Sequence, residues 1–126
     1  IPGIGAITAH AIAAAAGTGE QFASARNFAA WIGLTPRQHS SGGKQRSGGI
    51  SRQGDRRLRT LLTLGASTLM RSARTRSDRA TAWQRAMLSR RPMKVAVVAQ
   101  AAKTARIAFA ILRSGEPYRA PQAAAA

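Results

Sequence analysis

The chain has 126 residues, of which 20 are Lys or Arg and only 4 are Asp or Glu, so its formal net charge is +16. So few carboxylates argue against a self-contained metal nuclease, and the absence of cysteine excludes thiol nucleophiles and cysteine-ligated zinc. Long apolar stretches are interrupted by Arg or Lys before the roughly 18 to 20 residues needed to cross a bilayer, so we expect no membrane association. The excess of positive charge predicts a polyanionic partner, and nucleic acid is the first candidate.

The N-terminal segment opens with a glycine-rich turn, IPGIG, and a helix is expected over residues 6–16, ending at Gly17. Two interpretations are open. The segment can be the second half of a helix-hairpin-helix, in which the backbone N–H groups around Gly3 and Gly5 and the helix N-terminus bind a phosphate without reading sequence. It can equally be a plain turn that starts an alanine-rich helix.

A second, short helix is indicated by Ser24 as N-cap, by Phe28 and Ile32 at i, i+4 spacing, and by Gly33 just past its end. A small helix needs large apolar anchors to bury any surface. We therefore expect the aromatic residues of this region to be core residues and not platforms for nucleobases: Phe22, Phe28 and Trp31.

The hydrophobic periodicity stops between residues 34 and 54, where the sequence is rich in Gly, Ser and basic residues, which predicts a long loop. Loops longer than about 12 to 15 residues in compact domains are usually functional or disordered. Asp55 is the only acid near this loop and the helix that follows it. Six basic residues of this segment are predicted to contact nucleic acid: Arg37, Lys44, Arg46, Arg52, Arg56 and Arg59.

Three further helices are expected after this loop. Asp55 can cap a helix that runs to about residue 72, with one apolar stripe formed by Leu58, Leu61, Leu62, Gly65 and Leu69. A shorter amphipathic helix carries Trp83 and Met87 and ends before Pro92. The last helix, stopped by Gly115, has the clearest stripe of apolar residues: Val95, Val98, Ala102, Ala105, Phe109 and Leu112.

The predicted fold class is therefore all-α, a small helical domain with a helix-hairpin-helix-like N-terminal part and one long Gly/Ser/Arg-rich functional loop. The domain covers residues 1–120, divided into the N-terminal part (1–33), the basic catalytic loop (34–54) and a helical part (55–115). Residues 121–126 are expected to be a disordered, alanine-rich tail.

Three segments in this order support a resemblance to a known family. They are IPGIGAITA, FASARNFAAWIGLTPRQHSSGGKQRSGGISRQGDRRLRTLLTLGA and RRPMKVAVVAQAAKTARIAFAILRSGEPYR, and together they cover nearly the whole chain. The order and spacing of these pieces resemble the C-terminal, serine-bearing transposase domain of the IS-one-ten family of insertion-sequence transposases.

The resemblance implies a DNA recombinase whose separate N-terminal RuvC-like domain supplies metal-binding carboxylates, while this domain supplies a serine nucleophile. The matching position is Ser41, just before the glycines, with Ser40 as the near alternative. The family also implies that a guide RNA from the same element is a partner, that the full-length protein is a homo-oligomer, that Mg²⁺ is bound by the other domain and that the protein acts in the bacterial cytoplasm at the nucleoid. No cofactor or metal site is expected in this chain, so the isolated chain should be inactive.

The chemistry of the loop is compatible with a serine nucleophile. A hydroxyl that attacks a phosphodiester forms a phosphoserine bond and keeps the bond energy for rejoining. Arg37, Lys44 and Arg46 lie close to Ser41 in sequence and can stabilise the charge that develops on the phosphoryl oxygens. His39 can act as the base only if the loop is strand-like, so that both side chains share a side; a surface or phosphate-contacting role is the other interpretation.

Two hypotheses from different classes follow. In the first, the chain is the nucleophile-bearing domain of a transposase. In the second, it is a non-catalytic nucleic-acid-binding module of helix-hairpin-helix type, which uses the N-terminal turn and the basic loop to hold phosphates. Both hypotheses predict salt-sensitive binding to DNA, so only the fate of a serine variant separates them.

Overall fold

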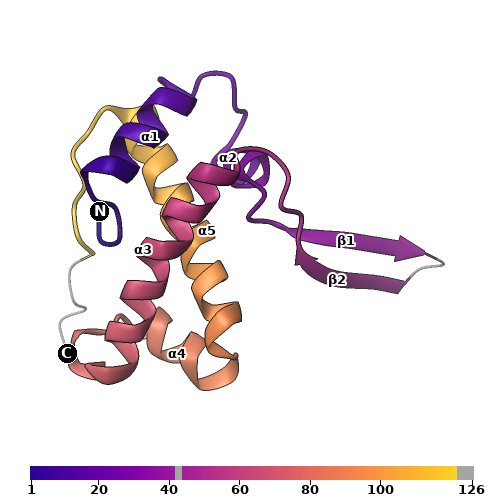
Figure 1. Ribbon diagram of the computed structural model, residues 1–126, viewed down its shortest axis with the longest axis vertical. Coiled ribbons are helices and arrows are strands. Elements are labelled where there is room, and N and C mark those ends of the chain that lie inside the picture. The colour runs from indigo at the N-terminus through magenta and orange to yellow at the C-terminus, as the bar shows by residue number, and fades with distance from the viewer. Residues whose placement is uncertain (42–43, 122–126) are drawn as a thin grey trace.

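The computed structural model describes residues 1–41 and 44–121 (Figure 1). The predicted all-α class is confirmed, because helices make up most of the described chain and the exception is one pair of strands. In chain order the elements are α1 (Ala6–Ala16), α2 (Ala25–Ile32), β1 (Pro36–Ser41), β2 (Lys44–Ile50), α3 (Arg56–Thr75), the 3-10 turn η1 (Ser77–Arg79), α4 (Ala82–Arg90) and α5 (Met93–Ser114).

Local capping residues set the helix ends where the sequence predicts them. The Ser24 hydroxyl accepts a hydrogen bond from the Asn27 N–H at 3.2 Å, and Asp55 Oδ1 accepts one from the Leu58 N–H at 3.0 Å. Helices α2 and α5 are both followed by a glycine in the left-handed conformation, Gly33 and Gly115. These caps fix where α2 stops and where α3 starts, and hence the two points between which the strands emerge.

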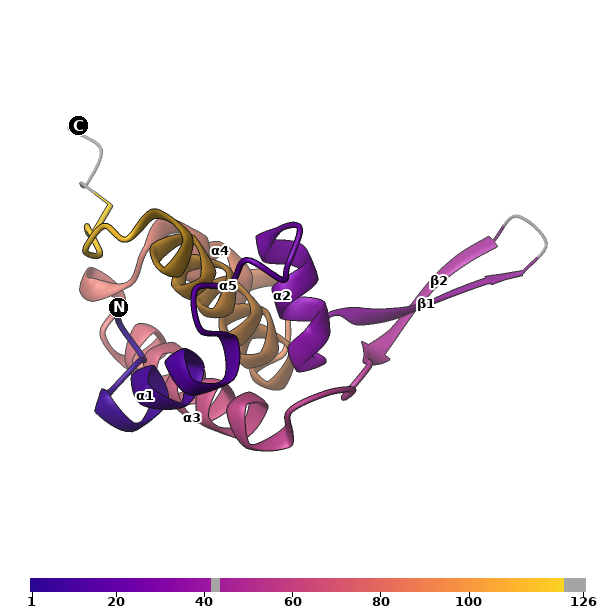
Figure 2. The same ribbon diagram turned by 90° about the horizontal axis from the view of Figure 1, so that it is seen from above.

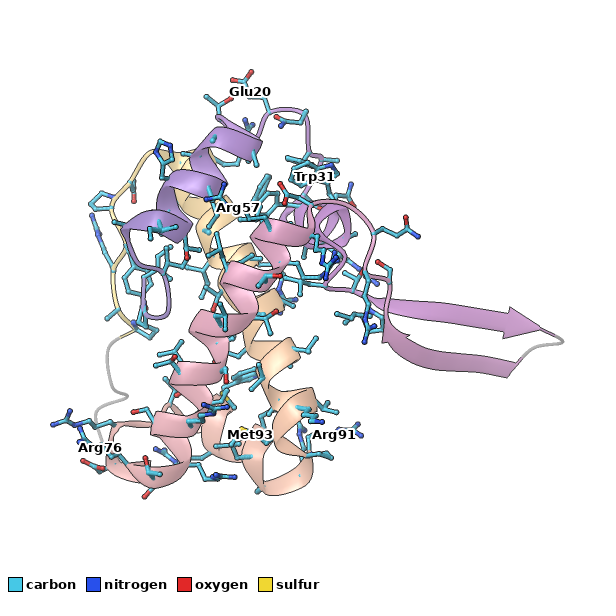
Figure 3. All side chains as sticks on the ribbon, in the orientation of Figure 1. Glu20, Trp31, Arg57, Arg76, Arg91 and Met93 are labelled. Carbon is cyan, nitrogen blue, oxygen red and sulfur yellow. The ribbon has the colours of Figure 1, made fainter. Side chains whose placement is uncertain are left out.

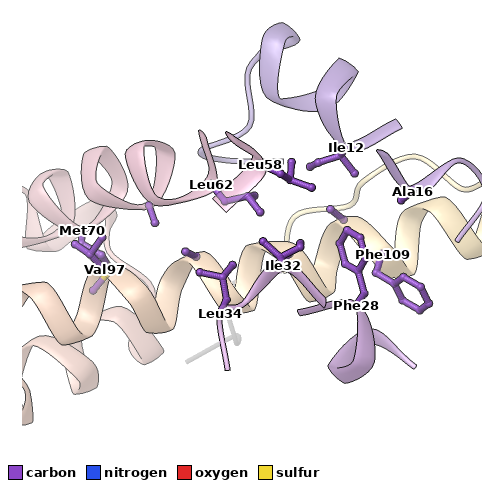
Figure 4. Packing of buried hydrophobic residues seen from close by; sticks show 14 of the residues in the cluster. Ile12, Ala16, Phe28, Ile32, Leu34, Leu58, Leu62, Met70, Val97 and Phe109 are labelled. Atoms are coloured by element: carbon purple, nitrogen blue, oxygen red, sulfur yellow. The ribbon is translucent and has the colours of Figure 1, made fainter. Parts of the chain in front are cut away.

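Helices α3 and α5 run antiparallel along the length of the molecule and form its centre, with α2 packed on α5 and α1 on α3 (Figures 1 and 2). Small residues of α5 let the two long helices approach, since Ala96, Ala101 and Ala105 are fully buried. Larger side chains fill the remaining space (Figure 4). The largest fully buried side chains are Phe28, Ile32, Leu34, Leu58, Leu62 and Met70.

The predicted aromatic core is confirmed for Phe28, which is fully buried, and for Phe22, which is half-buried against the core, but it is wrong for Trp31, which is exposed. Phe22 lies with its ring centroid 5.2 Å from that of Phe28 and 5.2 Å from that of Trp31, and Phe28 stacks on Phe109 at 5.6 Å. Trp31 keeps 39% of its surface exposed at the edge of this group. The rings therefore join α2 to the C-terminal half of α5.

The apolar stripe predicted for α5 is correct at Ala105 and Phe109 but is wrong at its N-terminal half. Val95 is 48% exposed and Val98 and Ala102 are half-buried, whereas the alanine-rich face around Ala96 and Ala101 is buried. Close approach to α3 is favoured by small side chains at the contact, which agrees with the burial of Ala96, Ala101 and Ala105, whereas Val95 and Val98 line an open groove. The stripe of α3 shifts similarly, because Leu58 and Leu62 are buried together with Ala66, Met70 and Ala73.

Helix α5 is also long and apolar enough to cross a membrane by length and composition alone, with a mean hydropathy of 1.6, which the sequence analysis did not anticipate. The core helix of a soluble protein passes the same test. In the structure, α2, α3 and α4 all pack against it.

The predicted loop over residues 34–54 is corrected, since most of it forms an antiparallel β-hairpin of β1 and β2. Neither strand shows alternating apolar residues, which is the usual sequence signal of a strand. The pairing is irregular between Pro36 and Gln38, because one residue of β1 faces two residues of β2 there. The predicted tail begins at Pro121, which has no regular structure, and its remaining residues, 122–126, lie outside the described residues.

Candidate nucleic-acid interface

The β-hairpin projects away from the helical body, and its outer end is remote from the core (Figures 1 and 2). Ser41 is the last residue of β1, at that outer end, and it pairs with Lys44, the first residue of β2. Backbone pairing also sets His39 opposite Arg46 and Ser40 opposite Gln45. The hairpin therefore carries both candidate serines on an extension outside the core.

The register sorts the positions of the hairpin into two faces. Positions two apart on a strand share a face, and directly paired positions share it too. Positions 39, 41, 44 and 46 accordingly lie on one face, which holds His39, Ser41, Lys44 and Arg46. The other face holds Gln38, Ser40, Gln45 and Ser47. The segment is thus strand-like, which is the condition under which His39 shares a face with Ser41.

Two glycines let the chain cross itself tightly where the hairpin leaves the helices. Gly33 has φ +84°, and a side chain there would collide with the backbone of Gln53; Gly54 has φ +80°, and a side chain there would collide with the carbonyl oxygen of Trp31. The Ser51 N–H donates to Thr35 O at 2.9 Å, and the Arg52 N–H donates to Gly33 O at 3.1 Å. We call this crossing, residues 33–35 and 51–54, the hairpin root.

Arg59 ties the hairpin root to α2. Its Nη1 donates to the backbone carbonyl of Ile32 at 2.9 Å and to that of Gln53 at 3.0 Å. This guanidinium nitrogen therefore joins the last residue of α2 to the segment that follows β2. The prediction that Arg59 contacts nucleic acid stays a prediction, and the structure gives the side chain a second role in supporting the hairpin.

Exposed arginines surround the hairpin root. Arg52, Arg56 and Arg57 are exposed, whereas Asp55, the single acid there, uses its carboxylate to cap α3. Arg52 has φ +56°, an uncommon value for a residue with a side chain. The side chains of Arg37, Lys44 and Arg46 lie outside the described positions, so for these three the structure gives only the backbone.

The N-terminal turn packs against α3. The Ile4 N–H donates to Ile1 O at 3.1 Å, and Gly3, with φ +82°, lies against Gly65 and Leu69. Gly5 is exposed, and nothing lies within 4 Å of the place its Cβ would take. The two glycines predicted to bind phosphate thus have different surroundings. Gly3 packs against α3, whereas Gly5 is open to solvent.

No group of three His, Asp or Glu residues that could hold a metal gathers among residues 1–41 and 44–121. The hairpin and its root therefore present a serine and cations, while carboxylates for metal chemistry are not assembled beside them in the part of the chain described.

A second set of arginines lies at the end of the bundle away from the root, where Figure 3 labels Arg76 and Arg91.

The hairpin has one signal in the sequence. Gly42-Gly43 separates two polar runs of similar length, and a two-residue Gly-Gly step between such runs is typical of hairpins. The glycine contacts of the root had no comparable signal, because they join positions about twenty residues apart.

Comparison with known proteins identifies relatives over almost the entire chain. A sequence model described as Transposase IS116/IS110/IS902 family matches residues 1–83. The chain is 50% identical over 119 residues to a "Probable family 20 transposase" of Pseudomonas aeruginosa, covering 94% of this chain and 35% of that protein. It is 45% identical over 119 residues to the "Transposase for insertion sequence element IS1111A" of Coxiella burnetii, covering 94% of this chain and 33% of that protein.

A more distant relative is the "Pilin gene-inverting protein" of Moraxella bovis, which is 33% identical over 125 residues, covering 94% of this chain and 36% of that protein. The chain thus spans about a third of the length of the curated relatives it matches. On the match to the family model and on these relatives, the chain belongs to the IS116/IS110/IS902 family of transposases.

Proposed function

We propose that the chain is the nucleophile-bearing part of a DNA transposase and that Ser41, at the outer end of the hairpin, attacks a DNA phosphodiester. The observation that carries this proposal is the register, in which Ser41 is paired with Lys44 and shares a face with His39 and Arg46 on an extension free of the core. A nucleophile that attacks a DNA phosphodiester must extend from the protein surface to reach it, and nearby cations stabilise the negative charge of the phosphate.

The attack exchanges one phosphoester bond for another. The Ser41 hydroxyl oxygen bonds to phosphorus, the bond from phosphorus to one sugar oxygen breaks, and that sugar hydroxyl leaves with a proton. The serine proton passes to a base. The phosphoserine bond that results is close in energy to the bond broken, so a second sugar hydroxyl can reverse the step and join a new strand without ATP. The name of the gene-inverting relative fits this proposal, because inversion requires both cutting and rejoining.

Proton removal and leaving-group stabilisation need more than the hairpin offers. His39 lies on the face of Ser41 and is one candidate base. Following the family resemblance, we assign the remaining help to carboxylates of a separate RuvC-like domain, with Mg²⁺ bound there to stabilise charge on the phosphoryl oxygens. The site is then composite, and this chain alone is expected to be silent in cleavage. A guide RNA and a homo-oligomeric assembly at the nucleoid belong to the same proposal.

In this proposal the arginines around the hairpin root hold the DNA while Ser41 reacts. Arg52 and Arg56 are exposed and suit phosphate contacts, as do the hairpin cations Arg37, Lys44 and Arg46. Arg59 supports the root through the Ile32 and Gln53 carbonyls and acts mainly as a positioning residue. The non-catalytic alternative uses the basic segment together with the N-terminal turn, and of the two glycines predicted to bind phosphate in that turn, only Gly5 has the open surroundings that a phosphate needs.

The test uses the full-length transposase that contains this chain, with a DNA substrate carrying the ends of the element. Ser41→Ala should abolish the covalent protein–DNA adduct that survives denaturation, while salt-dependent DNA binding stays unchanged. Ser40→Ala is the matched control, because position 40 lies on the opposite face, and it should retain the adduct. Adducts that persist in Ser41→Ala, or that disappear only in Ser40→Ala, would reject the assignment of Ser41 as nucleophile.

A further inference from the structure

A groove of about 1060 Å³ lies beside the hairpin root, between α2, α4 and α5. Its floor is the part of α5 that the bundle leaves uncovered, with Val95, Val98 and Ala102 at helical spacing, and Met87 and Ile50 line it from α4 and the end of β2. Val95 is 48% exposed. Helix α5 thus has two apolar faces: one buried against α3, and one open to this groove.

The far wall of the groove is held firmly in place. Helix α4 starts with a capping box between Thr81 and Gln84, and the Gln84 Nε2 then donates to Gln100 Oε1 on α5 at 3.2 Å. Gln100 Nε2 in turn donates to the Thr104 hydroxyl at 3.1 Å. These buried hydrogen bonds fix α4 on α5, so the groove is a preformed feature of the fold.

The rim of the groove is positively charged. Arg26, Arg52, Lys94 and Arg106 line it and are all exposed, and no Asp or Glu is among the described residues that line it. An apolar floor between cations is complementary to a ligand that presents an apolar ridge flanked by carboxylates or phosphates. The nature of the floor decides which of these two ligand classes fits.

The floor suits aliphatic side chains better than nucleobases. Single-stranded nucleic acids bind grooves by stacking their bases on aromatic rings. Among the described residues that line this groove, Trp83 carries the one aromatic ring, and the Lys103 ammonium lies over it, 4.2 Å from the ring centroid. The remaining apolar lining is aliphatic, from Ala, Val, Leu, Ile, Met and Pro. An amphipathic helix with side chains at i, i+3, i+4 and i+7 matches such a floor.

We propose that this groove docks an acidic amphipathic helix of a protein partner, with aliphatic side chains on α5 and carboxylates against the cationic rim. The proposal is independent of the identity of the nucleophile. Because Arg52 and Ile50 belong to both the groove and the segment that returns from the hairpin, a docked helix would lie directly beside the hairpin root.

The test measures binding of synthetic peptides to the chain of residues 1–126. One 18-residue peptide carries Leu at i, i+3, i+4 and i+7 with Glu on the flanks, and a second has the same composition in scrambled order. In a Trp31→Phe background Trp83 is the only tryptophan and reports occupancy of the groove. The patterned peptide should bind at least tenfold more tightly than the scrambled one at physiological salt and should shift the emission of Trp83.

Val98→Glu should remove this preference for the patterned peptide, because it puts a carboxylate on the floor. Ala110→Glu is the matched control, with the same charge change at an exposed position of α5 outside the groove, and it should keep the preference. Should Val98→Glu fail to fold, Lys94→Glu on the exposed rim replaces it and should weaken the patterned peptide by several fold. Equal binding of both peptides, or a single-stranded oligonucleotide that binds the groove in preference to the patterned peptide, overturns the proposal.

Discussion

Arg59 and Arg56 lie on the same helix, α3, but replacing them with Met should affect different properties. Arg59→Met should lower stability, and Arg56→Met should weaken DNA binding. Met keeps an apolar stem of similar length and removes the guanidinium. Arg59→Met deletes the hydrogen bonds to Ile32 O and Gln53 O. Ile32 is fully buried, so its carbonyl loses a charged donor and the loss costs roughly 1.5 to 3 kcal/mol, whereas Gln53 is exposed and water can replace the second bond.

We therefore expect Arg59→Met to lower the free energy of unfolding by about 1.5 to 3 kcal/mol. For a chain of this size the melting temperature should fall by roughly 3 to 5 °C for each kcal/mol. Arg56 is exposed, so Arg56→Met should change the free energy of unfolding by less than about 0.5 kcal/mol. Urea and thermal unfolding of the two variants measure this contrast.

DNA binding should show the reverse order. Each lost phosphate contact lowers the slope of log affinity against log salt by about 0.9. Arg56→Met should lower the slope by about that amount, and Arg59→Met should leave it unchanged at temperatures where the variant is folded. If Arg59→Met instead keeps full stability and lowers the salt slope, Arg59 is a phosphate contact and the explanation of the hairpin root is wrong.

Two further predictions concern packing and pH. Gly65→Ala should destabilise the fold by roughly 1 to 3 kcal/mol in urea unfolding, against the usual gain of about 1 kcal/mol for Ala over Gly in a helix, because its Cβ would collide with Gly3 O. Gly5→Ala has open space around its Cβ but replaces the N-cap of α1, so it should cost only about 0.5 to 1 kcal/mol. A stabilising Gly65→Ala would contradict the packing of the turn on α3. Burial, and to a smaller extent the nearby Arg106, lowers the pKa of Lys103 in the folded chain below the ordinary value of 10.5. At pH values between this lowered pKa and 10.5, Lys103 holds a proton more often in the unfolded chain than in the folded chain. The free energy of unfolding should therefore rise with pH in this window and level off near pH 10.5. Lys103→Met should lack this rise when urea unfolding of the two proteins is compared across the same pH range. If the stability of the parent protein instead falls with pH relative to Lys103→Met, the contact with the Trp83 ring, which favours the charged ammonium, outweighs burial.

Most of the helix ends could be predicted from the sequence because local signals mark them. Ser24 and Gly33 bracket α2 within a few residues, and Asp55 marks the start of α3. Such signals act over three or four residues and depend little on the rest of the fold. The face that α5 buries was harder to predict, because valine and alanine both count as apolar, and the contact with α3 buries Ala96 and Ala101 in place of Val95 and Val98.

The hairpin was missed for a different reason. Hydrophobic alternation marks a strand only when one of its faces is buried, and the apolar residues of this hairpin, Pro36 and Ile50, lie at its base. What holds the hairpin in position is concentrated at its root, in contacts of Gly33 and Gly54 with residues distant in sequence. A pattern read along the chain does not reveal such contacts.

The two regions where the structure departs from the sequence-based predictions, the hairpin and the N-terminal half of α5, lie next to each other. The hairpin is polar on both faces, and the stripe of α5 that should have been buried lines a groove whose wall includes the base of that hairpin. Local rules fail most often where a surface is kept for something other than the chain's own core. Both exceptions point to the region around the hairpin root, with nucleic acid proposed for the cationic hairpin and a protein helix for the aliphatic groove. Because Ile50, the last residue of β2, and Arg52, two residues further on, both line the groove, a helix that docks there would contact the segment that returns from the hairpin carrying Ser41.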